Sequence, residues 1–222
     1  MQYLIFDIET IPLGSLPDEL ENEVERRTQR EVDKGRLAAD DAESLVRSIS
    51  PFFGQVIAIG MRLYNPDSGE IKDKVIAESS EIDTLRVFLD TINHQASRDL
   101  KFVHYNGLNF DAPFIIIRAA HHGLPISNSR FTNLRKFAYD NHIDIMQFLS
   151  RWGNEGVSLD MACRSFGIPS PKEGEVQGNT VNAAFQAGDL DKVAEYVMRD
   201  VEATYQLFLR IMKYLPAGYG RR

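Results

Sequence analysis

Gln2-Tyr3-Leu4-Ile5-Phe6-Asp7-Ile8-Glu9-Thr10 is the stretch that decides the fold. Its start is mostly apolar, aromatic or β-branched, which predicts a buried strand over Gln2–Ile8. Asp7 and Glu9 stand at the predicted C-terminal end of this strand, and alternate residues of a strand point to the same side. Two carboxylates thus meet directly after a buried stretch, where their repulsion favours a bound cation. A polar strand end that enters a loop is the alternative interpretation.

The stretches that follow predict a mixed sheet. Gln55–Tyr64 and Ile71–Ala77 are strand-like and flank a turn at Asn65–Gly69, which indicates an antiparallel hairpin. Glu81–Asn93 has apolar residues at helical spacing and precedes a short strand at Phe102–His104, an order typical of a parallel crossover. We therefore expect an α/β fold, with an antiparallel hairpin and parallel strands in one sheet flanked by helices.

Several helices and one loop are also predicted. The charged stretch Asp18–Ser48 contains no Pro and a single Gly, which predicts one or two solvated helices inserted after the first strand. A helix is expected from Asp111 through His122, with a proline in its first turn. Asp189 is expected to cap a final amphipathic helix that runs to about Tyr214. Pro169–Glu175 is rich in turn formers and predicts a mobile loop.

Composition limits the class of protein. The 222 residues, 43% hydrophobic and 26% charged, suit one globular domain over residues 1–215 with a tail at 216–222. The sequence shows no apolar run long enough for a membrane span, and its start does not have the pattern of a signal peptide. We therefore expect a cytoplasmic protein with no membrane partner. Cys163 is the single cysteine, which excludes a cysteine zinc cluster. The net charge of −7 argues against a wide basic face for duplex phosphates.

Two further acids and one tyrosine complete a candidate cluster. Asp111 precedes a predicted helix, and the simple interpretation is a helix N-cap. Asp200 lies mid-helix, where an unpaired acid on the buried side would be costly. Tyr196 lies four residues earlier on the same helix face, and a half-buried core tyrosine is its alternative interpretation. Oxygen ligands without cysteine favour Mg²⁺ or Mn²⁺, and two such ions close together can cleave phosphodiesters.

Three segments in order carry a family resemblance: Phe6-Asp7-Ile8-Glu9-Thr10, Tyr105-Asn106-Gly107-Leu108-Asn109-Phe110-Asp111-Ala112-Pro113-Phe114-Ile115 and Tyr196-Val197-Met198-Arg199-Asp200. They resemble the three exonuclease motifs of the DEDD superfamily. The chain is most similar to stand-alone predicted 3′–5′ exonucleases related to the proofreading exonuclease domain of family B DNA polymerases. Because Tyr, not His, precedes the last Asp by four residues, the resemblance is to the tyrosine (DEDDy) subclass.

The resemblance implies a ribonuclease-H-like fold and a 3′–5′ exonuclease that hydrolyses single-stranded DNA ends to nucleoside 5′-monophosphates. It implies two Mg²⁺ or Mn²⁺ ions, with Asp7 bridging both. Glu9 and Asp200 would complete the first site, and Asp111 would hold the second, partly through water. Tyr196 would orient the attacking water. The four acids and Tyr196 would thus be catalytic, and the acids would be the metal ligands.

The same motifs imply substrate contacts by Asn106, Phe110 and Thr10. For Asn106, a turn residue before Gly107 is an equally good interpretation. Asp144 resembles a recurring Ile-Asp segment of the polymerase exonucleases, and it would also serve as a helix cap, so it is not counted among the ligands. The pair His121-His122 is expected to end a helix and not to bind zinc.

Other functions remain as alternatives. A 3′–5′ exoribonuclease uses the same metal chemistry, so the partner is a single-stranded DNA or RNA 3′ end. A catalytically weak nucleic-acid-binding module would be expected to lack one of the acids, and all four are present. A phosphatase with an Asp nucleophile gives no role to Tyr196 and Asp200. No motif specifies a repair or replication partner.

Overall fold

The computed structural model describes residues 1–35, 37–94, 97, 99–153, 155–172 and 178–215. Five strands form one sheet in the order β3-β2-β1-β4-β5. The strands are β1 (Tyr3–Pro12), β2 (Gly54–Tyr64), β3 (Ile71–Ile76), β4 (Lys101–His104) and β5 (His142–Asp144). The helices are α1 (Asp18–Asp33), α2 (Ala39–Ser48), α3 (Glu81–Asn93), α4 (Asp111–His121), α5 (Ser129–Thr132), α6 (Ile145–Leu149), α7 (Leu159–Ser165), α8 (Gly178–Gln186) and α9 (Leu190–Ile211), followed by a short 3₁₀ turn at Met212–Tyr214.

The sheet is mixed, as predicted. β2 pairs antiparallel with both β1 and β3, which confirms the hairpin, whereas β1, β4 and β5 run parallel to one another. The crossover from β3 through α3 to β4 returns the chain to the side of β1, so β1 lies at the centre of the sheet. The prediction of an α/β fold with an antiparallel hairpin and parallel strands is therefore confirmed.

Strand β1 is longer than the predicted Gln2–Ile8, because it continues to Pro12. Its antiparallel partner β2 holds it over the whole length, ending at the pair Pro12–Gly54. Asp7 and Glu9 were expected at the end of the strand, and this placement is wrong. The apolar run ends at the acids, but the backbone ladder with β2 does not, since hydrogen bonding of the main chain does not depend on the side chains.

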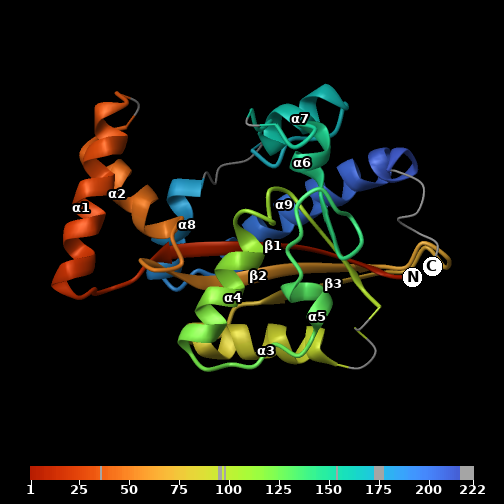
Figure 1. Cartoon of the computed structure of the whole chain (residues 1–222), viewed down its shortest axis with the longest axis horizontal. Helices are drawn as coiled ribbons and strands as arrows, with labels where there is room; N and C mark the ends of the chain where they lie inside the picture. Colours follow the sequence, from red (N-terminus) through yellow and green to blue (C-terminus); the bar gives the residue numbers. More distant parts are fainter. Residues whose placement is uncertain (36, 95–96, 98, 154, 173–177, 216–222) are drawn as a thin grey trace.

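Helices cover both faces of the sheet (Figure 1). On one face, Leu4, Phe6 and Ile8 of β1 pack in a core with residues of α3 and α4. On the other face, Ile5 packs in a second core with residues of α9, including Val201. Because side chains alternate along a strand, Asp7 and Glu9 share the face of Ile5 and lie under α9.

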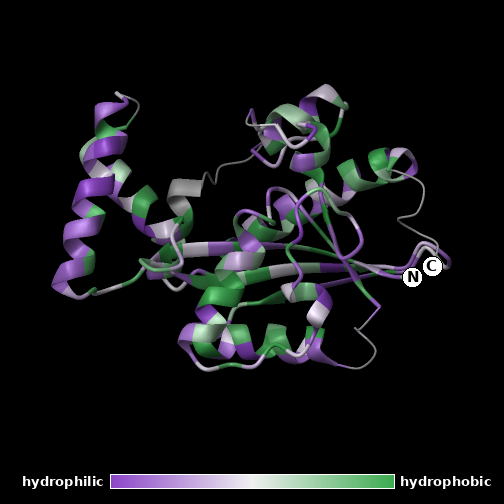
Figure 2. Cartoon of the chain, in the orientation of Figure 1, coloured by the Kyte–Doolittle hydropathy of each residue, from purple (hydrophilic) through white to green (hydrophobic). Residues whose placement is uncertain are grey.

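The predicted insertion forms a lobe of two helices, α1 and α2, at one end of the sheet (Figure 1). Figure 2 shows that α1 is hydrophilic over most of its surface. The lobe has a small core of its own, in which Val24 and Val46 pack against Phe53. The expected charged helical insertion is thus confirmed, and it joins the body of the protein next to the C-terminal end of β1, where the Thr10 hydroxyl donates to the Ser48 carbonyl at 2.8 Å.

The remaining predictions fall on the C-terminal third. Asp189 caps α9 by accepting a hydrogen bond from the Lys192 amide, as expected. In the predicted mobile loop, Ser170 is buried and bonds to Asp160, while residues 173–175 lie outside the described residues. The expected tail at 216–222 also lies outside them. No helix among the described residues combines the length and the apolar character that a membrane span requires.

Candidate active site

Asp7 and Glu9 lie where β1 runs past the end of β4. The parallel pairing of these strands stops at Ile5 and Val103, so the next part of β1 has a strand neighbour on one side only. Beyond Glu9 the register with β2 shifts, because Glu9 faces Ala58 while Thr10 faces Val56. Such a bulge re-aims side chains and is common next to active sites. The two carboxylates therefore project from a firmly held strand toward the face of the sheet that α9 covers.

Helix α9 packs on this face of the sheet and supplies Tyr196 and Asp200. Gly60 of β2 stands directly opposite Asp7, and an added Cβ there would lie 3.0 Å from Val197 and 3.1 Å from Val201. A glycine at this point lets α9 lie close to the sheet. Val197 and Val201 are fully buried against the sheet, and this contact fixes the position of Asp200 between them.

Three of the predicted acids come together. Carboxylate oxygens of Asp7, Glu9 and Asp200 all lie within 4.8 Å of one another. Burial and the charges of neighbouring acids raise the pKa of Asp7 and of Glu9 well above the usual range. Burial also raises the pKa of Asp200 to about 6, although Lys172 and Arg199 oppose that rise. Without a cation this cluster is repulsive, and hard oxygen donors at this spacing fit a divalent ion such as Mg²⁺ or Mn²⁺.

Asp111 lies beside the cluster but outside the group of three. It is the first residue of α4, and its carboxylate accepts a hydrogen bond from the Ile8 amide at 3.1 Å. The Ile8 amide belongs to the part of β1 that extends beyond its pairing with β4. The Asp111 carboxylate therefore accepts the hydrogen bond that a backbone carbonyl of a neighbouring strand would otherwise accept. Burial raises the pKa of Asp111 to about 7, and its charge in turn raises the pKa of Asp7 and Glu9.

The interpretation of Asp111 as a helix N-cap is wrong, since the N-cap of α4 is Phe110 and no side chain caps that helix. The Asp111 side chain turns instead toward the backbone of β1, a contact between residues 103 positions apart. Sequence patterns report local hydrogen bonding and do not reveal a pairing of this range.

Tyr196 shares one face of α9 with Asp200. The ring is half-buried and packs with a small apolar cluster that includes Ile11 and Ala58. Burial, followed by the charges of Asp200, Glu9 and Asp7, raises the pKa of the Tyr196 phenol above its usual range. The phenol therefore remains a hydrogen-bond donor at all physiological pH values.

Asn106 begins the tight turn that leads from β4 to Asp111. Its backbone is in the left-handed region (φ 65°), its amide donates to Asp144 at 3.0 Å, and its side chain accepts from Asn109 at 2.9 Å. The interpretation as a turn residue is therefore confirmed, and a substrate contact stays a prediction. The same holds for Phe110, which is half-buried with its ring 5.5 Å from that of Phe114. It also holds for Thr10, whose hydroxyl already donates to Ser48.

The Asp144 carboxylate holds this turn by hydrogen bonds to its backbone amides. It is fully buried, caps α6 by accepting from the Gln147 amide, and also accepts from the amides of Asn106 and Leu108. Burial opposes its ionisation, but nearby His104 and these backbone donors lower the pKa of Asp144 below its usual value. The prediction of a helix cap is confirmed, and the sequence alone does not reveal the two bonds to the turn.

Lys172 is a residue that the sequence analysis missed. Its charge, like that of Arg199, lowers the pKa of Asp200, so it lies within electrostatic range of the acids. It is exposed at the end of the segment anchored by Ser170. The only signal in the sequence is one positive charge in a turn-rich stretch, which is too common to select it.

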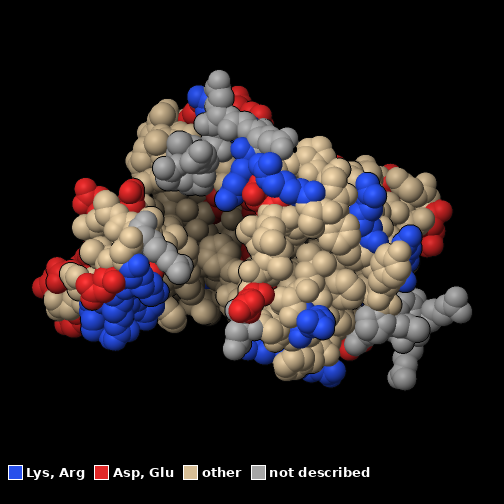
Figure 3. All heavy atoms as spheres, turned by 90° about the horizontal axis from the view of Figure 1, so that it is seen from above, with Lys and Arg blue, Asp and Glu red and all other residues tan. Residues whose placement is uncertain are grey.

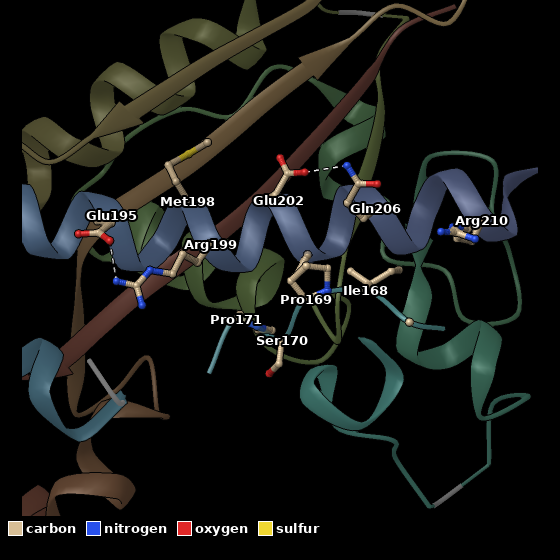
Figure 4. A pocket seen from close by; sticks show the side chains of 12 residues that line it. Ile168, Pro169, Ser170, Pro171, Glu195, Met198, Arg199, Glu202, Gln206 and Arg210 are labelled. Carbon is tan, nitrogen blue, oxygen red and sulfur yellow. Dashed lines mark hydrogen bonds and ion pairs between the residues drawn. The ribbon is translucent and has the colours of Figure 1, made fainter. Parts of the chain in front are cut away.

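A groove of about 630 Å³ lies between α9 and the Ile168–Pro171 segment. Figure 4 shows Arg199 beside Glu195 on one wall and the Ile168–Pro171 segment on the other. Arg199 bonds to Glu195 at 2.7 Å, and none of the four acids lines this groove. Figure 3 shows a separate hollow between the lobe of α1 and α2 and the rest of the molecule, seen from above.

Comparisons with known proteins agree with this geometry. The family described as "Predicted 3'-5' exonuclease related to the exonuclease domain of PolB" matches residues 50–216. This match includes Asp111, Tyr196 and Asp200, whereas Asp7 and Glu9 precede it. A comparison with curated proteins found no match.

Solved structures resemble the fold. The family B DNA polymerase of Pyrobaculum calidifontis is similar with a TM-score of 0.62 and 18% identity, over 96% of this chain and 25% of the polymerase chain. E. coli Exonuclease I, solved with a dT13 oligonucleotide, gives a TM-score of 0.47 and 11% identity, over 96% of this chain and 43% of its own. The chain thus spans a quarter of the length of the polymerase. Since the family match covers most of the chain, we conclude that this protein belongs to the family of predicted 3′–5′ exonucleases related to the exonuclease domain of PolB.

Proposed function

We propose that this protein hydrolyses single-stranded DNA from the 3′ end and releases nucleoside 5′-monophosphates, with two Mg²⁺ or Mn²⁺ ions. The observation that carries the proposal is the convergence of Asp7, Glu9 and Asp200, whose oxygens lie within 4.8 Å of one another. Burial raises the pKa of all three carboxyls, and neighbouring acids raise the pKa of Asp7 and Glu9 further, so the ionised cluster is unfavourable without a cation. An arrangement of this kind is expected where a cation, and not a side chain, offsets the charge of a phosphate.

The side chains suit this reaction. Water attacks the last phosphate, the bond from phosphorus to the 3′ oxygen of the preceding nucleotide breaks, and that oxygen leaves with a proton. When bound, the metal ions supply the positive charge that offsets the phosphate and acidifies the water. The four acids would hold the ions, with Asp111 kept in place by the Ile8 amide. The Tyr196 phenol, which stays protonated, would orient the water by hydrogen bonding.

The charge of the protein favours a single strand over a duplex. Binding of duplex phosphates depends on many Lys and Arg contacts, and this chain has a net charge of −7. A strand end that enters a narrow acidic hollow needs fewer such contacts, because the ions neutralise the phosphates nearest to the reaction. These considerations support a single strand, and not a duplex, as the substrate.

Digestion of 5′-labelled oligomers tests the proposal. Matched DNA and RNA 20-mers are incubated with Mg²⁺, Mn²⁺ or EDTA, and the products are separated by length. We expect a ladder of progressively shorter labelled DNA fragments with either metal and none with EDTA. A labelled mononucleotide as the first product would show the opposite direction and overturn the proposal. Faster cleavage of RNA than DNA would identify an exoribonuclease instead.

A further inference from the structure

The lobe formed by α1 and α2 carries a basic groove of about 590 Å³, and all of its charged lining residues precede the family match, which begins at residue 50. The groove is lined by four cations, namely Arg26, Arg27, Arg30 and Lys34, and by two carboxylates, Glu23 and Glu31. Its formal charge is therefore +2 on a protein of net charge −7. Lys and Arg gather on one side of this lobe, at the left of Figure 3.

The arginines of α1 are segregated on one face. The helix carries seven acids and three arginines, yet the arginines at 26, 27 and 30 stand at helical spacing and all line the groove. Glu23 is shared between Arg26 and Arg27, at 2.6 and 2.7 Å. Among the described residues, Arg30 has no ion-pair partner, which leaves its guanidinium available to a phosphate.

Apolar side chains lie beside these cations. Phe52 is 58% exposed and Ile49 is 51% exposed, and both line the groove. An exposed aromatic ring next to a basic groove is the combination that proteins use for single strands, because every base can stack on the ring while its phosphate meets a cation. A duplex, whose bases are already stacked, has no use for the Phe52 ring.

The groove lies at the end of the sheet that carries the acids. Phe52 precedes Gly54, which pairs with Pro12, and Pro12 lies three residues beyond Glu9 on β1. Three residues of a strand span about 10 Å. At roughly 3.4 Å for each stacked nucleotide, a DNA strand whose 3′ end lies at the acids needs at least about four nucleotides to reach the groove.

We propose that this groove binds the upstream part of the single-stranded DNA whose 3′ end lies among the four acids. The inference rests on the proposed function and adds a second contact region to it. The phosphates meet Arg30 and Lys34, and a base stacks on Phe52. Substrates too short to reach the groove do not use it, so the contribution of the lobe depends on substrate length.

The test compares the double variant Arg30→Gln/Lys34→Gln with the wild type on 5′-labelled dT3 and dT20. The matched control is Lys72→Gln/Lys74→Gln, which removes two exposed lysines from the edge strand β3. For dT20 we expect kcat/KM to fall about tenfold in the groove variant, and the slope of log kcat/KM against log salt to flatten by roughly 1.4, about 0.7 for each lost contact. Cleavage of dT3, and of either substrate by the control, stays unchanged.

Stacking is tested separately with Phe52→Ala against Phe137→Ala, another exposed ring, at 70% exposure. Only Phe52→Ala is expected to lower kcat/KM for dT20, by roughly tenfold. Thermal melting checks that each variant folds. Equal effects of the groove and control variants, or an equal loss on dT3 and dT20, would overturn the proposal.

Direct binding separates this proposal from the proposed function. Fluorescence anisotropy with labelled dT20 and with a 20-base-pair duplex is measured in EDTA, where no cleavage occurs. Weaker binding of dT20 by the groove variant supports the proposal even if the wild type cleaves nothing, in which case the proposed function alone fails. Unchanged binding of dT20, or an equal loss for the duplex, overturns the single-strand groove while leaving the nuclease assignment intact.

Discussion

All three of the other acids act on Asp7. Burial raises the pKa of Asp7, and the charges of Asp111, Asp200 and Glu9 raise it further. In the metal-free protein, therefore, its ionised form is destabilising. The same residue is expected to be indispensable when metal is bound. Stability without metal and activity with metal should thus respond in opposite directions to one substitution.

Asp7→Asn should abolish nuclease activity, to below about 1% of wild type, and stabilise the metal-free protein above pH 7. The pKa of Asp200 is about 6 and that of Asp111 about 7, above the usual range for an aspartate in an unfolded chain. The folded state therefore binds more protons than the unfolded state at pH 4–7, so its stability falls as pH rises through this window. Removing one charge relieves this loss.

The measurement is thermal melting in EDTA at pH 5 and pH 8. We expect the variant to melt roughly 2–6 °C higher than wild type at pH 8 and to lose most of that advantage at pH 5. A variant that melts lower at pH 8 would show that Asp7 has a stabilising partner and would contradict the repulsive cluster. Asp67→Asn, a change at an exposed aspartate, is the control.

A substitution at Tyr196 can distinguish a catalytic role of its phenol from a packing role of its ring. Tyr196→Phe keeps the ring against Ile11 and Ala58 but removes the phenol that we expect to orient water. The single-turnover rate should fall roughly 10- to 1000-fold while the melting temperature barely changes. Tyr214→Phe, a change at an exposed ring at the end of α9, serves as the control. A wild-type rate in Tyr196→Phe would leave the tyrosine a packing residue only.

At the scale of elements, the contact between β2 and α9 decides where Asp200 lies. Gly60 is paired with Asp7 across the two strands, and Val197 and Val201 of α9 lie close to this glycine. The helix carries two functional side chains, so a small displacement of its backbone moves both relative to β1. Positioning of catalytic groups is sensitive to shifts of this kind, because misplacement by about 1 Å can cost roughly a hundredfold in rate.

Gly60→Ala should therefore lower activity more than its effect on folding would suggest. The new methyl group would lie 3.0–3.1 Å from Val197 and Val201, which forces the helix to yield and costs about 1–3 kcal/mol of stability. Gly14→Ala, where nothing lies within 4 Å, is the matched control. Activity is measured at a temperature where both variants are folded. Normal activity in Gly60→Ala would show that the site tolerates movement of α9.

Much of this element arrangement could be predicted from the sequence, for physical reasons that differ by element. The strands and α9 were predictable because burial imposes a period on their side chains, as at Val193, Val197 and Val201. The candidate acids could be named from their motifs. The end of β1 was not predictable, since backbone pairing with β2 continues past the apolar run.

Individual hydrogen bonds between distant segments could not be predicted. The bond from the Ile8 amide to Asp111 and the bonds from the turn at Asn106 to Asp144 leave no periodic trace in the sequence. Each arises because a backbone amide that lacks a strand or helix partner must be satisfied by some other group. The side chain that satisfies it depends on how the sheet and helices pack, which local patterns do not encode.

At the scale of the whole molecule, metal binding and folding stability should be coupled. The acids come from β1, α4 and α9, and an ion held among them links the central strand with a helix from each face of the sheet. Anything that binds only the folded state stabilises it, by about 2.7 kcal/mol at a hundredfold excess over Kd.

Mg²⁺ should thus raise the melting temperature of the wild type, and EDTA should reverse the change. Ca²⁺ should stabilise in a similar way yet support little turnover, because its looser coordination positions the reacting groups poorly. Asp7→Asn should lose most of the stabilisation by either ion. Differential scanning fluorimetry across a metal titration measures this. An unchanged melting temperature in the wild type with saturating Mg²⁺, while nuclease activity is present, would contradict the coupling.

The bond between the Ile8 amide and the Asp111 carboxylate gives the protein an internal reporter. A backbone N–H that donates to a carboxylate experiences a different electric field when that carboxylate is protonated, ionised or bound to a cation. The ¹⁵N–¹H resonance of Ile8 should accordingly move during titration with acid or with Mg²⁺. One peak in a two-dimensional spectrum would then follow the state of the Asp111 carboxylate, without any substrate and without any bulky probe attached at the site itself.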